Sequence, residues 1–538
     1  MPLKSFHAFF FIVLVGVIFL AVSFPSFSRD IQFIPIQEIK RGMNGYGKTV
    51  FYGTRIENFE VEVIDVVIGK DISRSYIVVK VTDDRLRQLG GISAGMSGSP
   101  VYFADKIAGA LAYSWETKDN LIGVVTPIEA MFQLWDDPKK AALPPQAHPQ
   151  SLLYAFGMGE RGGERLRQKE QVHFKKVITL PKVFFGGATE PQEGELEPGS
   201  AVGVQLIHGD VDVVSLGTLT LRDGSDILAF GHPFLHRGKV SYYLSSMYVN
   251  FSLEGKDFPF KVGTPIQPVG IVEEDRGVGI TGRLGVMPQV ISTHIQINDE
   301  SKSVTDYHFD IVQDENVVVE FLPEIILDSI DQSLDRQVPG SVRVRLIVEG
   351  PRFHFDEDFF WMSKLDVASF TSNSLGNILE DIFKNPFSSI DAKKIDITVF
   401  FLSAIREATF KSLHLPVDVK RGGNLKGKVE FNMFREDTKT LDFSITVPAN
   451  FVSGEADVIA RGLSSNQDVS SSPSTSPTDF NSYLQEKVKQ LKTNGMVIEV
   501  RSKAETSPNE NPKTFFSQSI SLPFVLDGSF TGSVVIRE

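Results

Sequence analysis

Short segments in which apolar and polar residues alternate recur along this chain, and they restrict it to folds built from β-sheets. Residues 59–66 alternate apolar and acidic side chains, which is the period of a strand with one buried face. Residues 212–221 and 341–349 repeat this alternation farther along the chain. Glycine supplies 44 of the 538 residues and phenylalanine 42, which suits strands joined by tight turns. We therefore expect a mainly β protein of about two to four domains.

The stretch from residue 90 to residue 100 reads GGISAGMSGSP and is the most unusual in composition. Within it, Gly95-Met96-Ser97-Gly98 has the G-x-S-G form found around the nucleophile of chymotrypsin-type serine proteases. A tight glycine turn can aim the N–H groups of Gly95 and Ser97 at one point beside the Ser97 hydroxyl, where they would stabilise an oxyanion. A strand-to-strand turn without chemistry would also account for these residues, since glycine and serine are common in turns.

A serine nucleophile needs a base, and histidine is the usual base near neutral pH. His232 lies between Gly231 and Pro233 at the end of an apolar strand, where its side chain can be presented at the rim of a barrel. Residue type alone leaves a structural role for His232 equally open. Other histidines lie in alternating or aromatic runs that are typical of surface or core positions: His173, His308 and His354.

Composition excludes several classes of chemistry. The chain has no cysteine, which rules out disulfides, thiol catalysis and cysteine-bound zinc. The formal net charge is −13 and no basic stripe stands out, so we expect no nucleic-acid partner. His232 and His236 have the spacing of a zinc-binding helix, but a proline follows the first and no glutamate lies between them. Residues 356–358 are better explained as a solvated acidic turn than as a calcium loop. We expect neither a cofactor nor a metal ion.

The first 28 residues have the composition of a secretory signal peptide. Lys4 precedes an apolar stretch over residues 8–22, and Ser26 and Ser28 are small residues that fit cleavage after Ser28. An uncleaved membrane anchor is the alternative, although the apolar stretch is short for a full span. We therefore predict a periplasmic or secreted mature chain, with membrane contact only through this segment if it is uncleaved.

One local signal concerns a helix. Residues 126–129 read Thr-Pro-Ile-Glu, which predicts a capping box with proline at the first helical position and a short helix through Leu134.

The serine motif and its surroundings resemble the SpoIVB family of serine peptidases. Residues 82–86, Thr-Asp-Asp-Arg-Leu, precede the G-M-S-G-S-P motif of residues 95–100 as they do in that family. Residues 216–220 followed by residues 228–232 resemble the family's segment around its catalytic histidine, and residues 277–285 resemble the glycine-containing segment that comes next.

This resemblance implies a chymotrypsin-like double β-barrel in which Ser97 is the nucleophile and His232 the general base. Asp83 matches a family aspartate implicated in activity. The histidine segment precedes the serine segment in the family but follows it here, so the two halves are expected to be permuted, which a site defined by geometry tolerates. The family's PDZ domain is not evident, which suggests a different substrate. Three other acids near His232 could orient it instead: Asp210, Asp223 and Asp226.

We thus expect a mainly β fold, a permuted chymotrypsin-like double β-barrel followed by a β-sandwich-like C-terminal region. The predicted parts are a signal peptide (1–28), a barrel half with the serine motif (29–135), a linker (136–176), a barrel half with the histidine motif (177–300), an α+β or β-sandwich region (301–463), a Ser/Pro-rich linker (464–478) and a terminal helix with strands (479–538).

Three functions remain open on the sequence alone. The first is a secreted or periplasmic serine endopeptidase acting on a protein or peptide. The second is an inactive protease-like scaffold that binds an envelope protein or peptide. The third is a structural envelope protein that acts by strand addition at exposed sheet edges. The sequence does not set the oligomeric state.

Overall fold

The computed structural model describes residues 31–115, 120–141, 152–168, 177–182, 195–255, 258–300, 304–464, 477–503 and 514–538. Residues 33–538 form one compact unit, which contains everything that follows. The predicted signal peptide and much of both predicted linkers lie outside the described residues. In the described part, no helix is long and apolar enough to cross a membrane.

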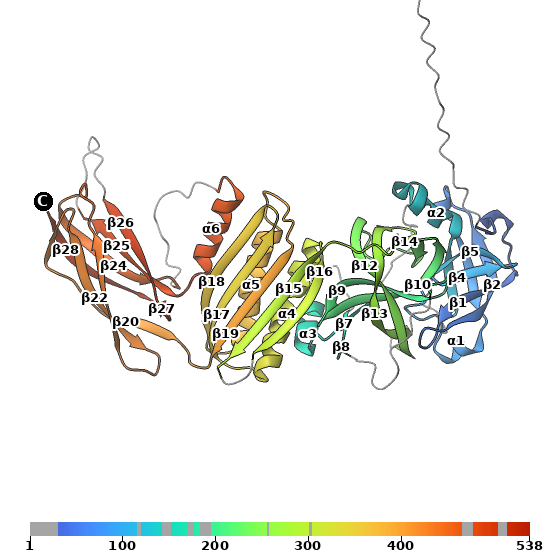
Figure 1. Ribbon diagram of the computed structural model, residues 1–538, viewed down its shortest axis with the longest axis horizontal. Helices are drawn as coiled ribbons and strands as arrows, with labels where there is room; N and C mark the ends of the chain where they lie inside the picture. The colour runs from blue at the N-terminus through green and yellow to red at the C-terminus, as the bar shows by residue number, and fades with distance from the viewer. Residues whose placement is uncertain are drawn as a thin grey trace, which may run out of the picture. The chain divides into compact units, whose positions relative to one another are not determined.

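The N-terminal strands close into a six-stranded barrel (Figure 1). Its interior is filled by the apolar side chains of the alternating segment, so Phe59, Val61 and Val63 are buried while Glu60 and Glu62 point outward. In barrel order the strands are β1 (Asn44–Val50), β2 (Ile56–Val67), β3 (Tyr76–Val81), β6 (Ile122–Pro127), β5 (Lys106–Ser114) and β4 (Pro100–Phe103). The helical elements of this part are η1 (Ile36–Glu38), η2 (Ile72–Arg74), α1 (Asp84–Gln88), α2 (Ile128–Asp136) and η3 (Pro138–Lys140).

A second six-stranded ring follows, closed by pairing between its first two strands in the sequence. The order around the ring is β9 (Ala201–Gly209), β12 (Gly238–Leu253), β13 (Phe260–Arg276), β14 (Gly279–Leu284), β11 (Asp226–Ala229) and β10 (Asp212–Asp223), which pairs back to β9. Two short strands, β7 (Leu153–Phe156) and β8 (Val177–Leu180), extend the sheet beyond β10. The predicted double β-barrel is therefore confirmed.

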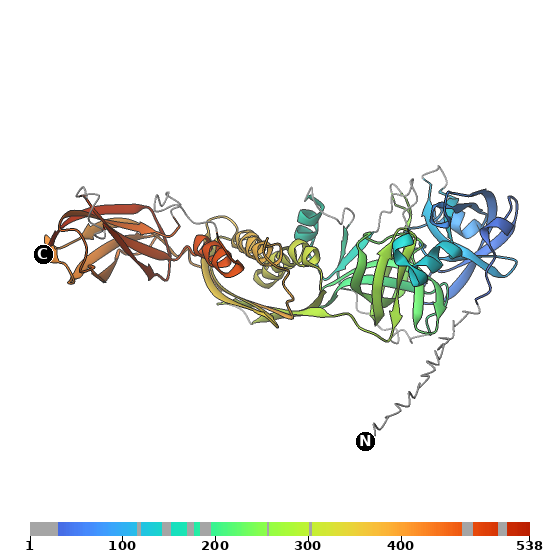
Figure 2. The same ribbon diagram turned by 90° about the horizontal axis from the view of Figure 1, so that it is seen from above.

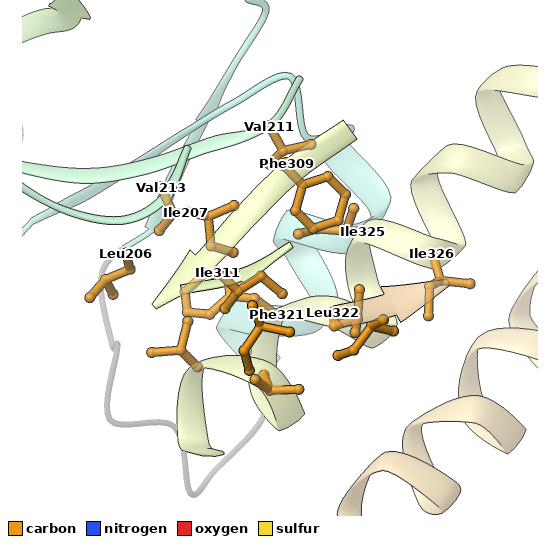
Figure 3. Close-up of a cluster of buried hydrophobic side chains, with 14 of the residues drawn as sticks. Leu206, Ile207, Val211, Val213, Phe309, Ile311, Phe321, Leu322, Ile325 and Ile326 are labelled. Atoms are coloured by element: carbon orange, nitrogen blue, oxygen red, sulfur yellow. The ribbon is translucent and has the colours of Figure 1, made fainter. Parts of the chain in front are cut away.

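The same sheet continues from β9 into an α/β layer. The added strands, in order, are β16 (Thr305–Val312), β15 (Val290–Asp299), β19 (Lys394–Leu402), β17 (Gly340–Gly350) and β18 (Phe353–Ser363). Helices cover one face of these strands (Figure 2): α4 (Glu315–Leu334), α5 (Val367–Phe383) and α6 (Phe480–Leu491), with α3 (Glu160–Gln168) packed on α4. Apolar side chains fill the space between α4 and strands β9 and β16, and several are labelled in Figure 3: Ile207, Phe309, Ile311, Phe321, Leu322 and Ile325.

The C-terminal strands form two sheets that enclose a separate apolar core, as predicted for a β-sandwich-like region. One sheet contains β23 (Lys439–Thr446), β22 (Asn424–Met433), β20 (Glu407–His414) and β27 (Val525–Asp527). The other contains β21 (Asp418–Lys420), β28 (Ser529–Arg537), β24 (Gly454–Gly462), β25 (Gly495–Ser502) and β26 (Phe515–Ser521). The sandwich thus takes strands from both sides of residue 463, whereas Leu484 and Val488 of α6 belong to the core of the α/β layer.

Helix α2 forms where it was predicted, but the predicted capping box is wrong. No side chain caps its first turn, and Pro127 occupies the cap position. The Thr126 hydroxyl donates instead to the carbonyl of Gly231, at 2.7 Å, and the Glu129 carboxylate accepts from the N–H of Ile36. A contact with the second barrel has replaced the local cap.

Candidate active site

Ser97 lies in the loop between α1 and β4, and glycines determine the path of that loop. Gly95 and Gly98 have φ values of +94° and +96°, a conformation that other residues adopt only with strain. A Cβ atom on Gly98 would lie 2.0 Å from the carbonyl oxygen of Thr218, and one on Gly95 would lie 3.1 Å from Leu216. The loop is therefore pressed against the second barrel at both glycines.

The amide groups on either side of Met96 make no hydrogen bond among the described residues. The N–H groups of Ala94, Met96 and Gly98 donate to Pro259, Ser93 and Leu111 respectively. Those of Gly95 and Ser97 donate to no acceptor among the described residues. They are the pair of donors predicted from the sequence for an oxyanion hole.

Strand β10 of the second barrel holds the serine loop by three hydrogen bonds. The N–H of Thr218 donates to the Ser97 carbonyl at 2.7 Å, and its hydroxyl donates to the Gly95 carbonyl at 3.0 Å. The hydroxyl of Thr220 donates to the Gly98 carbonyl at 2.7 Å. Because the carbonyls are fixed in this way, the orientation of the intervening amides is fixed as well.

His232 follows strand β11 of the second barrel in an unusual backbone segment. Phe230 and Gly231 both have φ +69°, and a bulky residue in this region is a rare feature that clusters at functional sites. Nδ1 of His232 lies 2.7 Å from the Pro233 carbonyl oxygen. A carbonyl only accepts, so Nδ1 carries the proton and the neutral ring has its lone pair on Nε2. His232 is only 6% exposed, and this burial lowers its pKa to about 4.

Ser97 and His232 both lie beside the end of β5, where each contacts Ala112 or Tyr113. The Ser97 hydroxyl donates to the Ala112 carbonyl at 3.4 Å. The rings of His232 and Tyr113 have centroids 5.4 Å apart, and a Cβ on Gly231 would lie 3.3 Å from that of Ala112. In this conformation the serine hydroxyl therefore donates to Ala112 and not to the histidine.

Asp83 lies at the N-terminus of α1, the helix that leads into the serine loop. Its carboxylate accepts from the N–H groups of Arg85, at 2.9 Å, and Leu86, at 3.4 Å, and it pairs with the Arg85 guanidinium at 3.0 Å. Partial burial opposes ionisation, but the hydrogen bonds and charge of Arg85 outweigh it and lower the pKa of Asp83. All described hydrogen bonds to its carboxylate come from these two residues.

The other acids considered for the histidine lie in turns or at the strand ends beside them. Asp210 accepts from the N–H of His308 at 2.7 Å. Asp223 and Asp226 are opposite one another in the antiparallel backbone register, on either side of the turn between β10 and β11.

No sequence pattern pointed to Asp275, which organises the loop that holds His232. Asp275 is fully buried, and its carboxylate accepts from the N–H groups of Phe234 (2.7 Å), Leu235 (2.7 Å) and Arg237 (3.3 Å). Burial raises the pKa of Asp275, against the opposing effect of these N–H groups. In the sequence it follows two glutamates and precedes an arginine, which is typical of an exposed turn, so no pattern distinguished it.

Lys261 and Tyr113 are two further residues that the sequence did not suggest. Lys261 is 2% exposed; its main-chain N–H donates to Ala94 at 3.0 Å and its Nζ to the Thr49 hydroxyl at 2.7 Å. Burial lowers the pKa of Lys261 to about 7. The Tyr113 hydroxyl beside His232 is buried without a hydrogen-bond partner among the described residues, and burial raises its pKa.

The two β-barrels, with Ser97 on a glycine turn of the first and His232 on a loop of the second, have the chymotrypsin-like double-barrel architecture. The profile of the SpoIVB peptidase S55 family matches residues 14–132, which confirms the resemblance over that segment. The match includes Asp83 and Ser97 and ends before His232, and it supports assignment to the serine peptidases. Neither the curated proteins nor the solved structures gave a match.

Proposed function

We propose that this protein is a serine endopeptidase that cleaves a protein substrate, with Ser97 as nucleophile and His232 as general base. The observation that carries the proposal is the convergence of these two side chains on Ala112 and Tyr113, although they come from different barrels. The amides of Gly95 and Ser97, which make no hydrogen bond among the described residues, lie in the same loop and support it.

In the proposed reaction, Nε2 of His232 takes the proton of the Ser97 hydroxyl as its oxygen attacks the scissile carbonyl. The amides of Gly95 and Ser97 hold the resulting oxyanion. The imidazolium then gives its proton to the leaving amine, and water hydrolyses the acyl-enzyme by the same route. The Pro233 carbonyl accepts from Nδ1–H throughout and so keeps the proton on that nitrogen. In the Ser-His-Asp arrangement an aspartate holds the histidine tautomer in this way.

The resemblance implied that Asp83 takes part in activity, but in this proposal Asp83 has a positioning role. Its contacts support a role in fixing the start of α1, and through it the serine loop. Asp275 would act in the same indirect way on the histidine side.

For location, we propose that the mature chain works in the periplasm or outside the cell. The signal-like composition of residues 1–28 supports this location.

A fluorophosphonate probe, which reacts with activated serines, tests the proposal on the full chain. We expect covalent labelling that is lost in Ser97→Ala and in His232→Ala, since removing either group from a serine–histidine pair costs on the order of 10⁶-fold in turnover. Ser225→Ala, at an exposed position in the turn between β10 and β11, is the matched control and should label normally. Labelling that survives Ser97→Ala would overturn the assignment.

The inactive scaffold is the second candidate, favoured by one observation: the Ser97 hydroxyl donates to Ala112 and not to His232. It predicts that the wild-type chain does not react with the probe at any pH at which it is folded.

A further inference from the structure

Two histidines and an aspartate lie together on the face of the α/β layer that the helices do not cover. His294 on β15 and His308 on β16 are directly opposed in the antiparallel register, and their rings are parallel with centroids 4.4 Å apart. Asp306 lies two residues before His308, so its side chain shares this face. One ligand atom from each of the three residues lies within 4.8 Å of the other two.

The short distances within this cluster involve atoms that can bind metal. Nε2 of His294 lies 2.8 Å from a carboxylate oxygen of Asp306. Ligand atoms around a tetrahedral zinc ion lie about 3.3 Å apart, given bonds of about 2.0 Å. One ligand atom of each side chain therefore already lies within reach of a shared ion. Because the two rings are now parallel, each must turn about its own side-chain bonds until a nitrogen lone pair, which lies in the ring plane, points at that ion. The side chains of His294 and Asp306 are 29% and 42% exposed, so an ion can reach them from solvent.

A second carboxylate lies near the other ring nitrogen of His294. Asp396 on β19 is level with His294 in the parallel register, and its Oδ1 lies 3.6 Å from Nδ1 of His294. Its other oxygen is held by Lys394 Nζ at 2.6 Å. Metal-binding histidines characteristically present their second ring nitrogen to a carboxylate, which fixes the tautomer and increases the basicity of the ligand.

We propose that His294, His308 and Asp306 form a binding site for a divalent transition-metal ion of the zinc class, with Asp396 as the outer carboxylate and solvent in the fourth position. Two imidazoles and one carboxylate suit zinc, whereas magnesium and calcium require mainly oxygen ligands. Zinc bound here would link β15 to β16, the strand that joins the layer to the second barrel through β9. The competing explanation is a set of surface histidine–aspartate ion pairs that binds no metal.

Zinc binding to the untagged full-length chain, stripped with EDTA and titrated by calorimetry, tests the site without any measurement of peptidase activity. We expect about one zinc per chain with micromolar or tighter affinity, and a higher melting temperature when zinc is present. His294→Ala, His308→Ala and Asp306→Asn should each weaken binding by at least about 10-fold, and Asp396→Asn by about 10-fold. Magnesium and calcium should not bind there.

His354→Ala is the matched control, because this exposed histidine on β18 also faces an acid across a strand pair, Glu349 at 3.8 Å. Among the described residues, His354 is not part of a cluster with a second histidine. This variant should bind zinc normally. Melting temperatures measured in EDTA establish that the variants fold. A wild-type chain that binds no zinc, or a His294→Ala/His308→Ala double variant that binds it as tightly as wild type, would overturn the proposal.

Discussion

The main-chain N–H of Thr218, on the second barrel, donates to the carbonyl of Ser97, on the first, at 2.7 Å. The candidate nucleophile is therefore held by a strand that lies far away in the sequence. The same strand, β10, accepts a hydrogen bond from Phe230, two residues before His232, through the Thr218 carbonyl at 3.3 Å. A single residue thus connects the serine loop to the histidine segment, and any shift between the barrels would move both candidate groups.

Gly98→Ala should disrupt this connection. The new methyl group would lie 2.0 Å from the Thr218 oxygen and 2.5 Å from the Phe230 nitrogen, so the barrels would have to separate. We expect a loss of unfolding free energy of about 3 kcal/mol or more, and loss of fluorophosphonate labelling. Gly224→Ala is the control, because Gly224 also has a positive φ, +61°, but nothing lies within 4 Å of its added Cβ. It should cost only about 1 kcal/mol and label normally. Equal effects of the two substitutions would contradict the argument.

Asp275→Asn should impair the site through the loop that holds His232. An asparagine has one acceptor oxygen where the carboxylate has two, so part of the set of N–H groups from Phe234, Leu235 and Arg237 would lose its acceptor. We expect a loss of about 1–3 kcal/mol in unfolding free energy. The rate of probe labelling, measured well below the melting temperature, should fall by about 10-fold, as for misplaced catalytic groups.

Glu274→Gln is the neighbouring control for Asp275. Glu274 pairs with Arg276 at 2.8 Å, and glutamine keeps an oxygen that can accept from the Arg276 guanidinium, so the labelling rate should stay within about two-fold of wild type. If Asp275→Asn labels at the wild-type rate, the carboxylate does not position the histidine.

On the acid side of the pH–rate profile, the rate of probe labelling should fall at an unusually low pH. Burial lowers the pKa of His232 to about 4, so the neutral ring that can accept a proton persists well below the ordinary histidine pKa of about 6.5. We expect the second-order rate of probe labelling to be nearly constant from pH 7 to pH 5.5 and to fall toward pH 4. Circular dichroism over the same range separates titration from unfolding. A midpoint near 6.5 in a chain that remains folded would show that His232 is solvated in the reactive state.

Much of the fold was predictable because each strand carries its own signal. The alternation of residues 59–66 reappears as buried Phe59, Val61 and Val63, and the glycine turn around Ser97 fixed the site of the candidate nucleophile. These are local properties of a few consecutive residues. The closure of the second barrel by β9–β10 pairing, and the extension of the same sheet through β16, depend on contacts between distant segments that no local pattern encodes.

The supporting residues of the site could not be predicted, for a physical reason. Lys261 and Asp275 are charged residue types in ordinary strand sequences, and only tertiary packing buries them. Thr126 and Glu129 had the spacing of a capping box, but tertiary acceptors and donors, Gly231 and Ile36, took their hydrogen bonds. In each case a long-range contact decided the role.

Lys261 should make the stability of the protein depend on pH. Burial lowers the pKa of its ammonium group to about 7, against about 10.5 in the unfolded chain. Below pH 7 both states are protonated and folding carries the full cost of burying the charge. Between pH 7 and 10.5 the unfolded chain binds more protons than the folded one, so this contribution to stability rises with pH across that window.

Lys261→Met removes the buried charge while keeping the length and apolar character of the side chain. It also removes the hydrogen bond to the Thr49 hydroxyl, which costs about 1 kcal/mol and should be smaller than the cost of the charge at pH 7. We expect a variant with a melting temperature at least about 2–4 °C higher than wild type at pH 7. The difference should shrink or reverse by pH 10, where the folded wild type has already lost the proton. A constant difference from pH 6 to pH 10 would mean that Lys261 keeps its charge in the folded protein.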